Sequence, residues 1–256
     1  MKKNVVIIGA GNVATHLSIA IRNADYNIIQ VYSRQIDNAV LLASLLGVEA
    51  TDNLEEIDRS ADIYLIAVSD SAIEKVVAQL PGLKGVVAHT SGSMDMDLLE
   101  KFDNYGVFYP FQTFTKEKQL RVSEVPLLLE ASSPRAEKVL LELARDISNK
   151  VQISNARMRK ALHISAVFAC NFVNHMYALA GELLEKEGLS FTLLEPLIRE
   201  TTQKALTMSA RDAQTGPARR KDRVVMNRHI ETLNDKSFHR EIYTLVSESI
   251  MKMYSE

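Results

Sequence analysis

The stretch VVIIGAGNVA, residues 5–14, decides the fold of this chain. Four apolar residues lead directly into Gly9-Ala10-Gly11, and a helical pattern of apolar positions follows. A second apolar run at residues 28–32 ends in Ser33-Arg34. This order of strand, glycine turn, helix and strand is typical of a dinucleotide-binding unit.

Glycine is needed in this turn because the backbone bends tightly and comes close to a pyrophosphate. The pyrophosphate then rests on the free N–H groups at the start of the helix. Ala14 takes the place of the third glycine, where the fingerprint accepts alanine. We therefore expect the pyrophosphate of a dinucleotide to contact Gly9, Gly11, Asn12 and Val13.

The end of the second strand indicates which dinucleotide binds. Sites for NAD usually have an acidic residue about 20 residues after the glycines, where it holds the ribose 2′-hydroxyl. This chain has Ser33 and Arg34 there, and arginine forms strong, often bidentate hydrogen bonds with phosphate oxygens. The alternative is an ordinary surface arginine, and Asp37 close by favours a ribose hydroxyl instead. We predict NADP(H), with Ser33 and Arg34 at its 2′-phosphate.

The composition of the chain narrows the possible functions. Its 256 residues are ample for a buried core, and a net charge of −2 argues against a protein dedicated to nucleic acids or membrane surfaces. Cys170 is the single cysteine, so a disulfide framework or a cysteine metal cluster is excluded, and no other spacing indicates a metal site. We find no signal sequence or bilayer-spanning apolar run, and we expect a cytoplasmic protein with a small-molecule substrate.

Up to residue 153 the sequence alternates between short apolar runs and helical patterns. Strands are predicted near residues 5–8, 28–32, 48–50, 62–68, 86–88, 106–108, 126–129 and 151–153. A helix from Asp37 to Leu46 is closed by Gly47, and further helices are predicted at residues 71–79 and 136–147. This alternation predicts an α/β fold with a Rossmann-like, doubly wound, mostly parallel sheet.

From about residue 156 the strand patterns stop and long helical patterns take over. Residues 158–186 are nearly continuous up to Gly188, and Ser190 is placed to cap a helix that reaches about Ala210. Residues 238–253 predict an amphipathic last helix. We therefore expect two domains, an NADP-binding Rossmann-like domain at 1–153 and an all-helical substrate and dimerisation domain at 154–256.

Two polar clusters follow predicted strands of the sheet, and ligands of doubly wound sheets bind beyond the carboxyl ends of the strands. Val68, Ser69 and Asp70 follow one strand and are expected beside the nicotinamide ribose. His89-Thr90-Ser91-Gly92 follows another strand, and His89 is a candidate for polarising a carbonyl or imine. The alternative is that these polar groups only close the loop.

A second group of polar residues is predicted on the long helix after the sheet. Residues 161–179 are apolar on almost every side, which implies burial against the sheet domain or a second subunit. His163, Asn171 and Asn174 nevertheless share an arc of roughly 80°. Either a ligand or other core groups would supply the partners that buried polar groups need. We predict His163 as proton donor and Asn171 as the residue that orients substrate, with His89 as the other catalytic candidate.

Together these motifs resemble the Rossmann-like domain of the pyrroline-5-carboxylate reductase and ketopantoate reductase type. The residues that carry the likeness are Gly9–Ala14, Ser33-Arg34, Ala67–Asp70 and His89–Gly92. The later motifs resemble a helical partner domain of unknown function, similar to the C-terminal domain of 6-phosphogluconate dehydrogenase; they are Tyr109–Phe114, His163–Asn171 and Thr215–Asp222. Two positions depart from the family pattern, with Tyr109 in place of histidine and Lys221 in place of glycine.

The resemblance implies an NADP-dependent oxidoreductase that forms a homodimer through its C-terminal helices. With the residues above, it predicts hydride transfer between NADP(H) and a small carbonyl, imine or hydroxy compound bound between the two domains. Two alternatives are a non-catalytic sensor that binds NADPH and an oxidoreductase that depends on a deazaflavin. The family has no established substrate, so the likeness extends to the reaction class alone.

Overall fold

The described strands of the N-terminal part of the chain form one sheet. The strands are β1 (Asn4–Ile8), β2 (Asn27–Tyr32), β3 (Glu49–Thr51), β4 (Ile63–Ile66), β5 (Val86–His89), β6 (Tyr105–Pro110), β7 (Leu127–Ala131) and β8 (Val151–Ile153). Their order in the sheet is β3-β2-β1-β4-β5-β6-β7-β8. Neighbouring strands are parallel except β6 and β7, which are antiparallel. The prediction of a doubly wound, mostly parallel sheet is confirmed.

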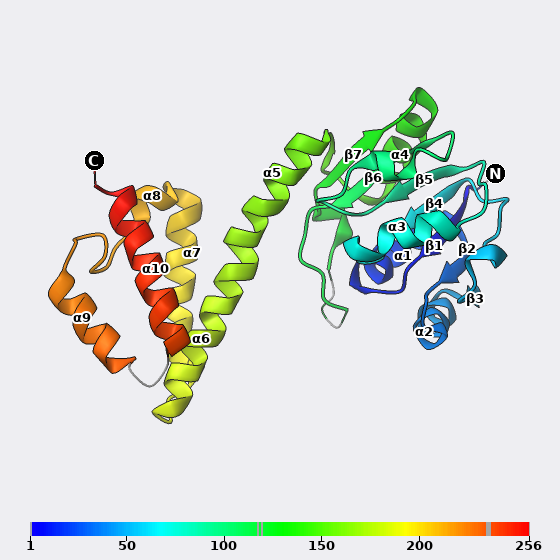
Figure 1. Cartoon of the computed structure of the whole chain (residues 1–256). Helices are drawn as coiled ribbons and strands as arrows, with labels where there is room; N and C mark the ends of the chain where they lie inside the picture. Colours follow the sequence, from blue (N-terminus) through cyan, green and yellow to red (C-terminus); the bar gives the residue numbers. More distant parts are fainter. Residues whose placement is uncertain (1, 117, 119, 234–236, 256) are drawn as a thin grey trace. The chain divides into compact units, whose positions relative to one another are not determined.

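The central strands are apolar because helices cover both of their faces. Val5, Ile7 and their neighbours on one face pack against α1 (Asn12–Asn23), α2 (Ile36–Leu46) and α4 (Pro134–Ile147). Val6 and Ile8 point to the other face and pack against α3 (Asp70–Gln79). Successive side chains of a strand point to opposite faces, so both layers of the core come from the same short run of β1. Figure 1 shows these helices around the sheet.

The register of the strands places the predicted ligand-binding segments side by side. Ile8 at the end of β1 pairs with both Tyr32 of β2 and Ile66 of β4. Ile66 in turn pairs with His89 at the end of β5. The segments that follow these residues, among them the glycine turn, therefore leave the sheet at one common edge.

The boundaries of the helices in this part of the chain are close to those predicted. α2 ends at Leu46, and Gly47 follows with a φ of 73°, in the left-handed region that favours glycine at a helix end. α3 and α4 each begin slightly before the predicted position. The described residues of this part also form three short 3-10 helices, η1 (Leu54–Glu56), η2 (Met96–Leu99) and η3 (Val122–Glu124).

After β8 the described residues form helices, as predicted. The helices are α5 (Ala156–Ala166), a π-helical segment η4 (Val167–Phe172), α6 (Val173–Lys186), η5 (Phe191–Leu194), α7 (Glu195–Thr207), α8 (Ala210–Ala213), α9 (Arg223–Thr232) and α10 (Ser237–Met253). The single helix predicted from Ser190 to Ala210 is wrong, because η5, α7 and α8 share this segment. Ser190 caps η5 instead, where its Oγ accepts a hydrogen bond from the Thr192 N–H.

This computed structural model describes residues 2–116, 118, 120–233 and 237–255, which divide into two compact units (Figure 1). The units are Met1–Cys170 and Asn171–Glu256. The first unit therefore contains α5 as well as the sheet. The predicted border at 153/154 marks the point where strands give way to helices, and as a border between domains it stays a prediction.

Lys221, one of the two departures from the family pattern, has a backbone conformation that favours glycine. Its φ of 57° is in the left-handed region, which side chains with a Cβ rarely adopt. Glycine occupies this region without steric cost, which accounts for the glycine that the family pattern has at this position.

None of the helices in the described ranges has the length and apolar character that crossing a membrane requires.

Candidate active site

The glycine turn joins the end of β1 to the start of α1, and each glycine has a different role. Gly9 has a φ of 129°, and a Cβ added to it would lie 2.2 Å from the Ala67 carbonyl oxygen, so this position requires glycine. A Cβ on Gly11 would meet nothing within 4 Å. Packing within the chain therefore does not require glycine at position 11. The missing side chain leaves open space in front of α1, where a ligand backbone or phosphate can approach.

The start of α1 keeps its capacity to bind an anion. Gly11 is the N-cap residue and provides no side-chain cap, and the first turn contains no acidic residue. The side chain of Asn12 is already engaged, because its Nδ2 donates a hydrogen bond to the Phe114 carbonyl oxygen at 2.8 Å. Any pyrophosphate here would therefore be held by backbone N–H groups and by the partial positive charge at the helix start.

A cavity of about 490 Å³ lies on the β2 side of the glycine turn, and we call it the β2-side cavity. Its lining includes Gly9, Gly11, Ser33 and Arg34, as well as Val68 and Ser69. None of the described residues that line it is acidic, and the exposed Asp37 is not among them. Asp37, which argued for a ribose 2′-hydroxyl, therefore does not line this cavity.

Lys75 adds a second cation to the β2-side cavity and was missed in the sequence. No ion pair of the described residues includes Lys75 or Arg34. Helical spacing could have indicated Lys75, because Ala72, Lys75 and Gln79 follow one another along one side of α3 and line the cavity together. Two unpaired cations and no carboxylate fit a site for a nucleotide with an additional phosphate.

A second cavity, of about 350 Å³, shares Gly11, Ala67, Val68 and Ser69 with the first. We call it the β5-side cavity. Its further lining brings together residues of five segments; they are Asn12, Val13, Asp70, Thr90, Ser91, Gly92, Tyr109, Pro110, Gln112 and His163. The structure thus groups Asp70 with His163, which are far apart in the sequence. Two adjoining cavities along one sheet edge suit an elongated ligand with a reaction partner at one end.

His89 does not line either cavity. It is fully buried, its Nδ1 accepts a hydrogen bond from the Ser91 N–H at 3.2 Å, and its Nε2 lies 3.2 Å from the Asp95 carbonyl oxygen. Because Nδ1 accepts, Nε2 carries the proton and donates to Asp95. Burial lowers the pKa of His89 to about 4, so the ring is neutral. This geometry favours the loop-closing alternative over a role in catalysis.

Tyr109 and His163 form a hydrogen-bonded pair in the β5-side cavity. The Tyr109 hydroxyl oxygen lies 3.0 Å from His163 Nδ1. A Cβ on Gly92 would come within 2.6 Å of the Tyr109 ring and 2.7 Å of His163 Nδ1, so both side chains pack directly onto this glycine. Burial, with a smaller contribution from the Asp70 carboxylate, raises the pKa of Tyr109 to about 12. The sequence showed Tyr109 as a departure from the family pattern but gave no signal of its partner.

Arg159 fixes the start of α5 one helical turn before His163. It is fully buried, forms an ion pair with Glu130 of β7, and its Nη2 donates to the Met94 carbonyl oxygen at 2.6 Å. A buried, paired arginine holds its neighbours strongly, because removing either charge would leave the other uncompensated. α5 is therefore attached both to the sheet and to the loop that follows β5.

Asp70 is the carboxylate of the β5-side cavity. It is the first residue of α3, where a negative charge is favourable near the helix start. Its Oδ2 accepts a hydrogen bond from the Ser93 hydroxyl, which connects α3 to the loop after β5. In the described residues no group of histidine, cysteine and carboxylate side chains could hold a metal ion.

Asn171 is not among the residues that line the two cavities. It is exposed in the π-helical segment η4 and is the first residue of the second unit. Its role in orienting substrate stays a prediction.

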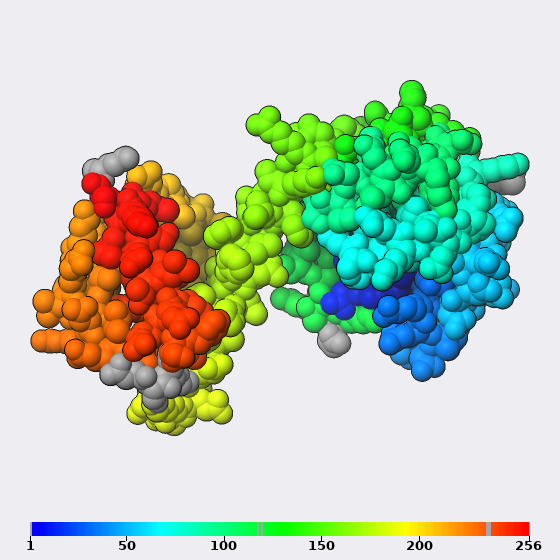
Figure 2. Space-filling model, in the orientation of Figure 1, coloured from blue at the N-terminus to red at the C-terminus, as the bar shows by residue number. Residues whose placement is uncertain are grey.

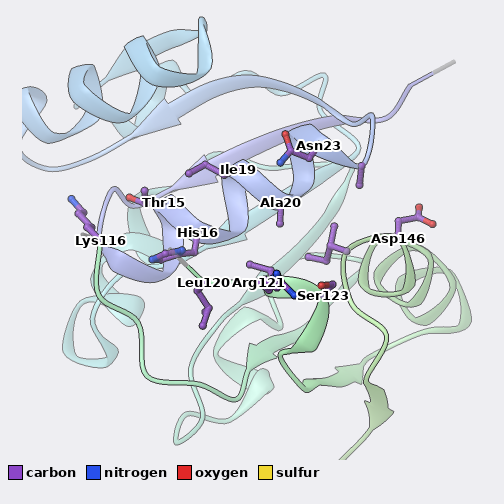
Figure 3. Close-up of a pocket in the computed structure, with 13 residues that line it drawn as sticks. Thr15, His16, Ile19, Ala20, Asn23, Lys116, Leu120, Arg121, Ser123 and Asp146 are labelled. Atoms are coloured by element: carbon purple, nitrogen blue, oxygen red, sulfur yellow. The ribbon is translucent and has the colours of Figure 1, made fainter. Parts of the chain in front are cut away.

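A larger cavity, of about 660 Å³, lies along the side of α1 (Figure 3). Thr15, His16, Ile19 and Asn23 of α1 line one wall, while residues 120–123 line another. This cavity does not include the strand ends or the glycine turn. Ligands of doubly wound sheets bind at the carboxyl ends of the strands, so we assign the candidate site to the two smaller cavities.

The fold and the position of its cavities define a Rossmann-fold enzyme that uses a dinucleotide. Residues 4–88 match the family described as "NADP oxidoreductase coenzyme F420-dependent", and residues 125–250 match "Domain of unknown function (DUF2520)". The crystal structure of a "putative NADP oxidoreductase" from Bacteroides fragilis is 39% identical, with a TM-score of 0.91 and 98% of each chain covered. The chain belongs to this family of NADP oxidoreductases.

Two more distant structures share the fold. A reductive aminase from Aspergillus terreus is 15% identical with a TM-score of 0.73, over 98% of this chain and 93% of that one. A pyrroline-5-carboxylate reductase from Coxiella burnetii is 17% identical with a TM-score of 0.55, over 100% of this chain and 98% of that one. At these identities the likeness extends to the fold alone. The search of the curated proteins found no match.

Proposed function

We propose that this protein transfers a hydride between NADP(H) and a small carbonyl, imine or hydroxy compound. The observation that carries the proposal is the pair of adjoining cavities at the glycine turn, one with two unpaired cations and the other with a histidine–tyrosine pair. The first cavity suits a phosphorylated nucleotide. The second suits proton exchange with a substrate.

The residues of the site fit NADP(H). Backbone N–H groups at residues 11–13 would hold its pyrophosphate, and Ser33, Arg34 and Lys75 would hold its 2′-phosphate. Val68 and Ser69 line both cavities and Asp70 lines the β5-side cavity, and the three residues would border the nicotinamide ribose. When bound, NADPH supplies the hydride, which is chemistry that protein side chains do not provide.

Side chains of the protein would supply a proton to the substrate and a negative charge beside it. A reduced carbonyl or imine needs a proton on its oxygen or nitrogen, and His163 lines the β5-side cavity with Nε2 left for that contact. The Asp70 carboxylate lines the same cavity and favours a substrate that carries positive charge. A neutral imine gains this charge when its nitrogen takes up the proton, so among the three substrate classes we favour imines.

Titration of the purified protein with NADPH and with NADH tests the cofactor. We expect tighter binding of NADPH, because the 2′-phosphate meets Arg34 and Lys75. Hydrogen bonds to charged groups contribute about 1.5 to 3 kcal/mol each, so Arg34→Ala is expected to weaken NADPH binding roughly tenfold to hundredfold. Lys75→Gln is expected to have a smaller effect in the same direction, and both variants leave NADH binding nearly unchanged.

Arg135→Ala is the matched control, since Arg135 is an exposed arginine on α4 and lines neither cavity. It is expected to bind NADPH as the wild type does. If the wild type binds neither nucleotide, the proposed function is wrong. If NADPH binds but Arg34→Ala keeps the full preference for it, the enzyme class stands and the assignment of Arg34 is wrong.

A deazaflavin-dependent oxidoreductase is the second candidate, favoured by the description of the family that residues 4–88 match. A wild type that oxidises NADPH only when the oxidised deazaflavin is added would support this candidate.

A further inference from the structure

The pairing of β6 with β7 and the packing on Gly92 hold the Tyr109 and His163 side chains against each other. Tyr109 is on β6, where it pairs with Leu128 of β7, and only 9% of it is exposed. Its hydroxyl oxygen is 3.0 Å from His163 Nδ1, and the two rings are inclined at 62°. Gly92 closes the remaining space, since even a methyl group there would overlap both side chains. The pair therefore has little freedom to separate.

The side chain of His163 is supported from its own helix as well. Arg159 precedes it by four residues, so the two lie on the same side of α5. The contacts of Arg159 with Glu130 and with the Met94 carbonyl oxygen attach this side of the helix to β7 and to the loop after β5. The position of the His163 ring is thus set by the helix, and its hydrogen-bonding direction is set by Tyr109.

The direction of the hydrogen bond follows from the partners of the tyrosine. Because burial and the Asp70 carboxylate raise the pKa of Tyr109 to about 12, its hydroxyl keeps its proton at neutral pH. Among the described residues His163 Nδ1 is the one hydrogen-bond partner of this buried hydroxyl, so the hydroxyl donates its proton to the unprotonated ring nitrogen of a neutral histidine. Nδ1 is then the acceptor, and the proton of the neutral imidazole is on Nε2.

We propose that Tyr109 is a positioning residue that holds His163 in the tautomer with its proton on Nε2. This tautomer presents an N–H group to the β5-side cavity, where it would bind a carbonyl oxygen or an imine nitrogen. The inference rests on the proposed function for the identity of this acceptor. The tautomer itself is a property of the protein without any substrate, so it can be measured independently.

Long-range ¹H–¹⁵N NMR of ¹⁵N-labelled protein distinguishes the two tautomers of a neutral histidine. Spectra would be recorded at about pH 9, where histidine side chains are normally neutral. His163→Gln identifies the resonances of His163 among the six histidines, because its signals disappear. We expect the wild type to show one tautomer, protonated on Nε2. Tyr109→Phe removes only the hydroxyl and is expected to give a mixture of both tautomers.

Tyr105→Phe is the matched control, because Tyr105 is on the same strand and lines neither cavity. It is expected to leave the His163 signals unchanged. A wild type protonated on Nδ1 overturns the proposal, as does a Tyr109→Phe variant with the tautomer of the wild type. Should Tyr109→Phe fail to fold, a wild type protonated on Nδ1 would still overturn the proposal. NADPH titration of the same samples reports on the proposed function separately.

Discussion

His89 illustrates how burial determines the role of a single side chain. At the end of β5 it was a candidate catalytic residue, but both ring nitrogens are used inside the loop that it begins. An imidazole that is buried and neutral in the folded state cannot take up a proton until the pH falls well below its ordinary range. The same residue therefore couples the stability of the protein to pH.

We predict that the protein loses stability as the pH falls from about 6.5 to about 4. The pKa of His89 is about 4 when folded against an ordinary 6.5, so between these values the unfolded chain binds a proton that the folded protein does not. Over this window the loss attributable to His89 is at most about 3 kcal/mol. Thermal unfolding of wild type and His89→Gln at pH 7 and pH 4.5 measures it.

His89→Gln is expected to be less stable at pH 7, because it loses two buried hydrogen bonds, but to show a smaller further decrease at pH 4.5. Other titrating groups affect both proteins alike, so the difference between the two decreases isolates His89. Equal decreases in wild type and variant would contradict the prediction.

At the scale of elements, the site is made where the sheet register aligns the ends of β1, β4 and β5. The segments after these strands approach so closely that an added Cβ would overlap neighbouring atoms at two glycines, Gly9 and Gly92. A side chain at position 9 would overlap the Ala67 carbonyl oxygen, which belongs to the backbone and cannot move easily. Gly92 is enclosed by the Tyr109 and His163 side chains, which can shift at some cost.

Gly92→Ala is therefore expected to fold, to lose roughly 1 to 3 kcal/mol of unfolding free energy, and to displace the Tyr109–His163 pair. Gly82→Ala is the matched control, since a Cβ on Gly82 would meet nothing within 4 Å. Denaturant unfolding of both variants measures the free energies. If Gly92→Ala is as stable as Gly82→Ala, the inference that Tyr109 and His163 pack closely on Gly92 is wrong.

At the scale of the whole molecule, the second unit has an unusual balance of buried and exposed side chains. Among its described residues the buried ones are Leu179, Ala218, Met226, Leu233 and Ser247. Large apolar side chains are exposed on several of its helices, among them Leu197 on α7 at 62% and Leu245 on α10 at 70%. Figure 2 shows α10, in red, uncovered on the face that is drawn. Exposed apolar surface of this extent is typical of a protein interface.

We propose that a second copy of the chain covers this surface, giving the homodimer that the family resemblance implies. Leu197→Glu combined with Leu245→Glu would place two charges in such an interface and is expected to give monomers. Light scattering coupled to gel filtration measures the mass. Leu41→Glu is the control, because Leu41 on α2 is also 70% exposed but belongs to the first unit. A wild type with the mass of one chain would refute the dimer.

Much of the fold could be predicted because its signals lie within a few neighbouring residues. The β-branched run before Gly9, the glycines themselves and the capping Gly47 each act locally through backbone conformation. The division of residues 190–213 into η5, α7 and α8 was not predicted, and neither was α9. Their starts also carry local signals, since Pro196 lies in the first turn of α7, and Ser209 and Asp222 cap α8 and α9.

The sequence by itself determined the glycine turn, the cationic end of β2 and the strands that lead to the site, because each depends on short-range order along the chain. Only the tertiary structure decided that Tyr109 meets His163 across 54 residues, that Lys75 joins Arg34, and that His89 turns into its loop. Contacts of this kind depend on strand register and on the anchoring of α5, which arise from packing between distant segments. A local pattern cannot encode which distant side chain will fill the space beside it.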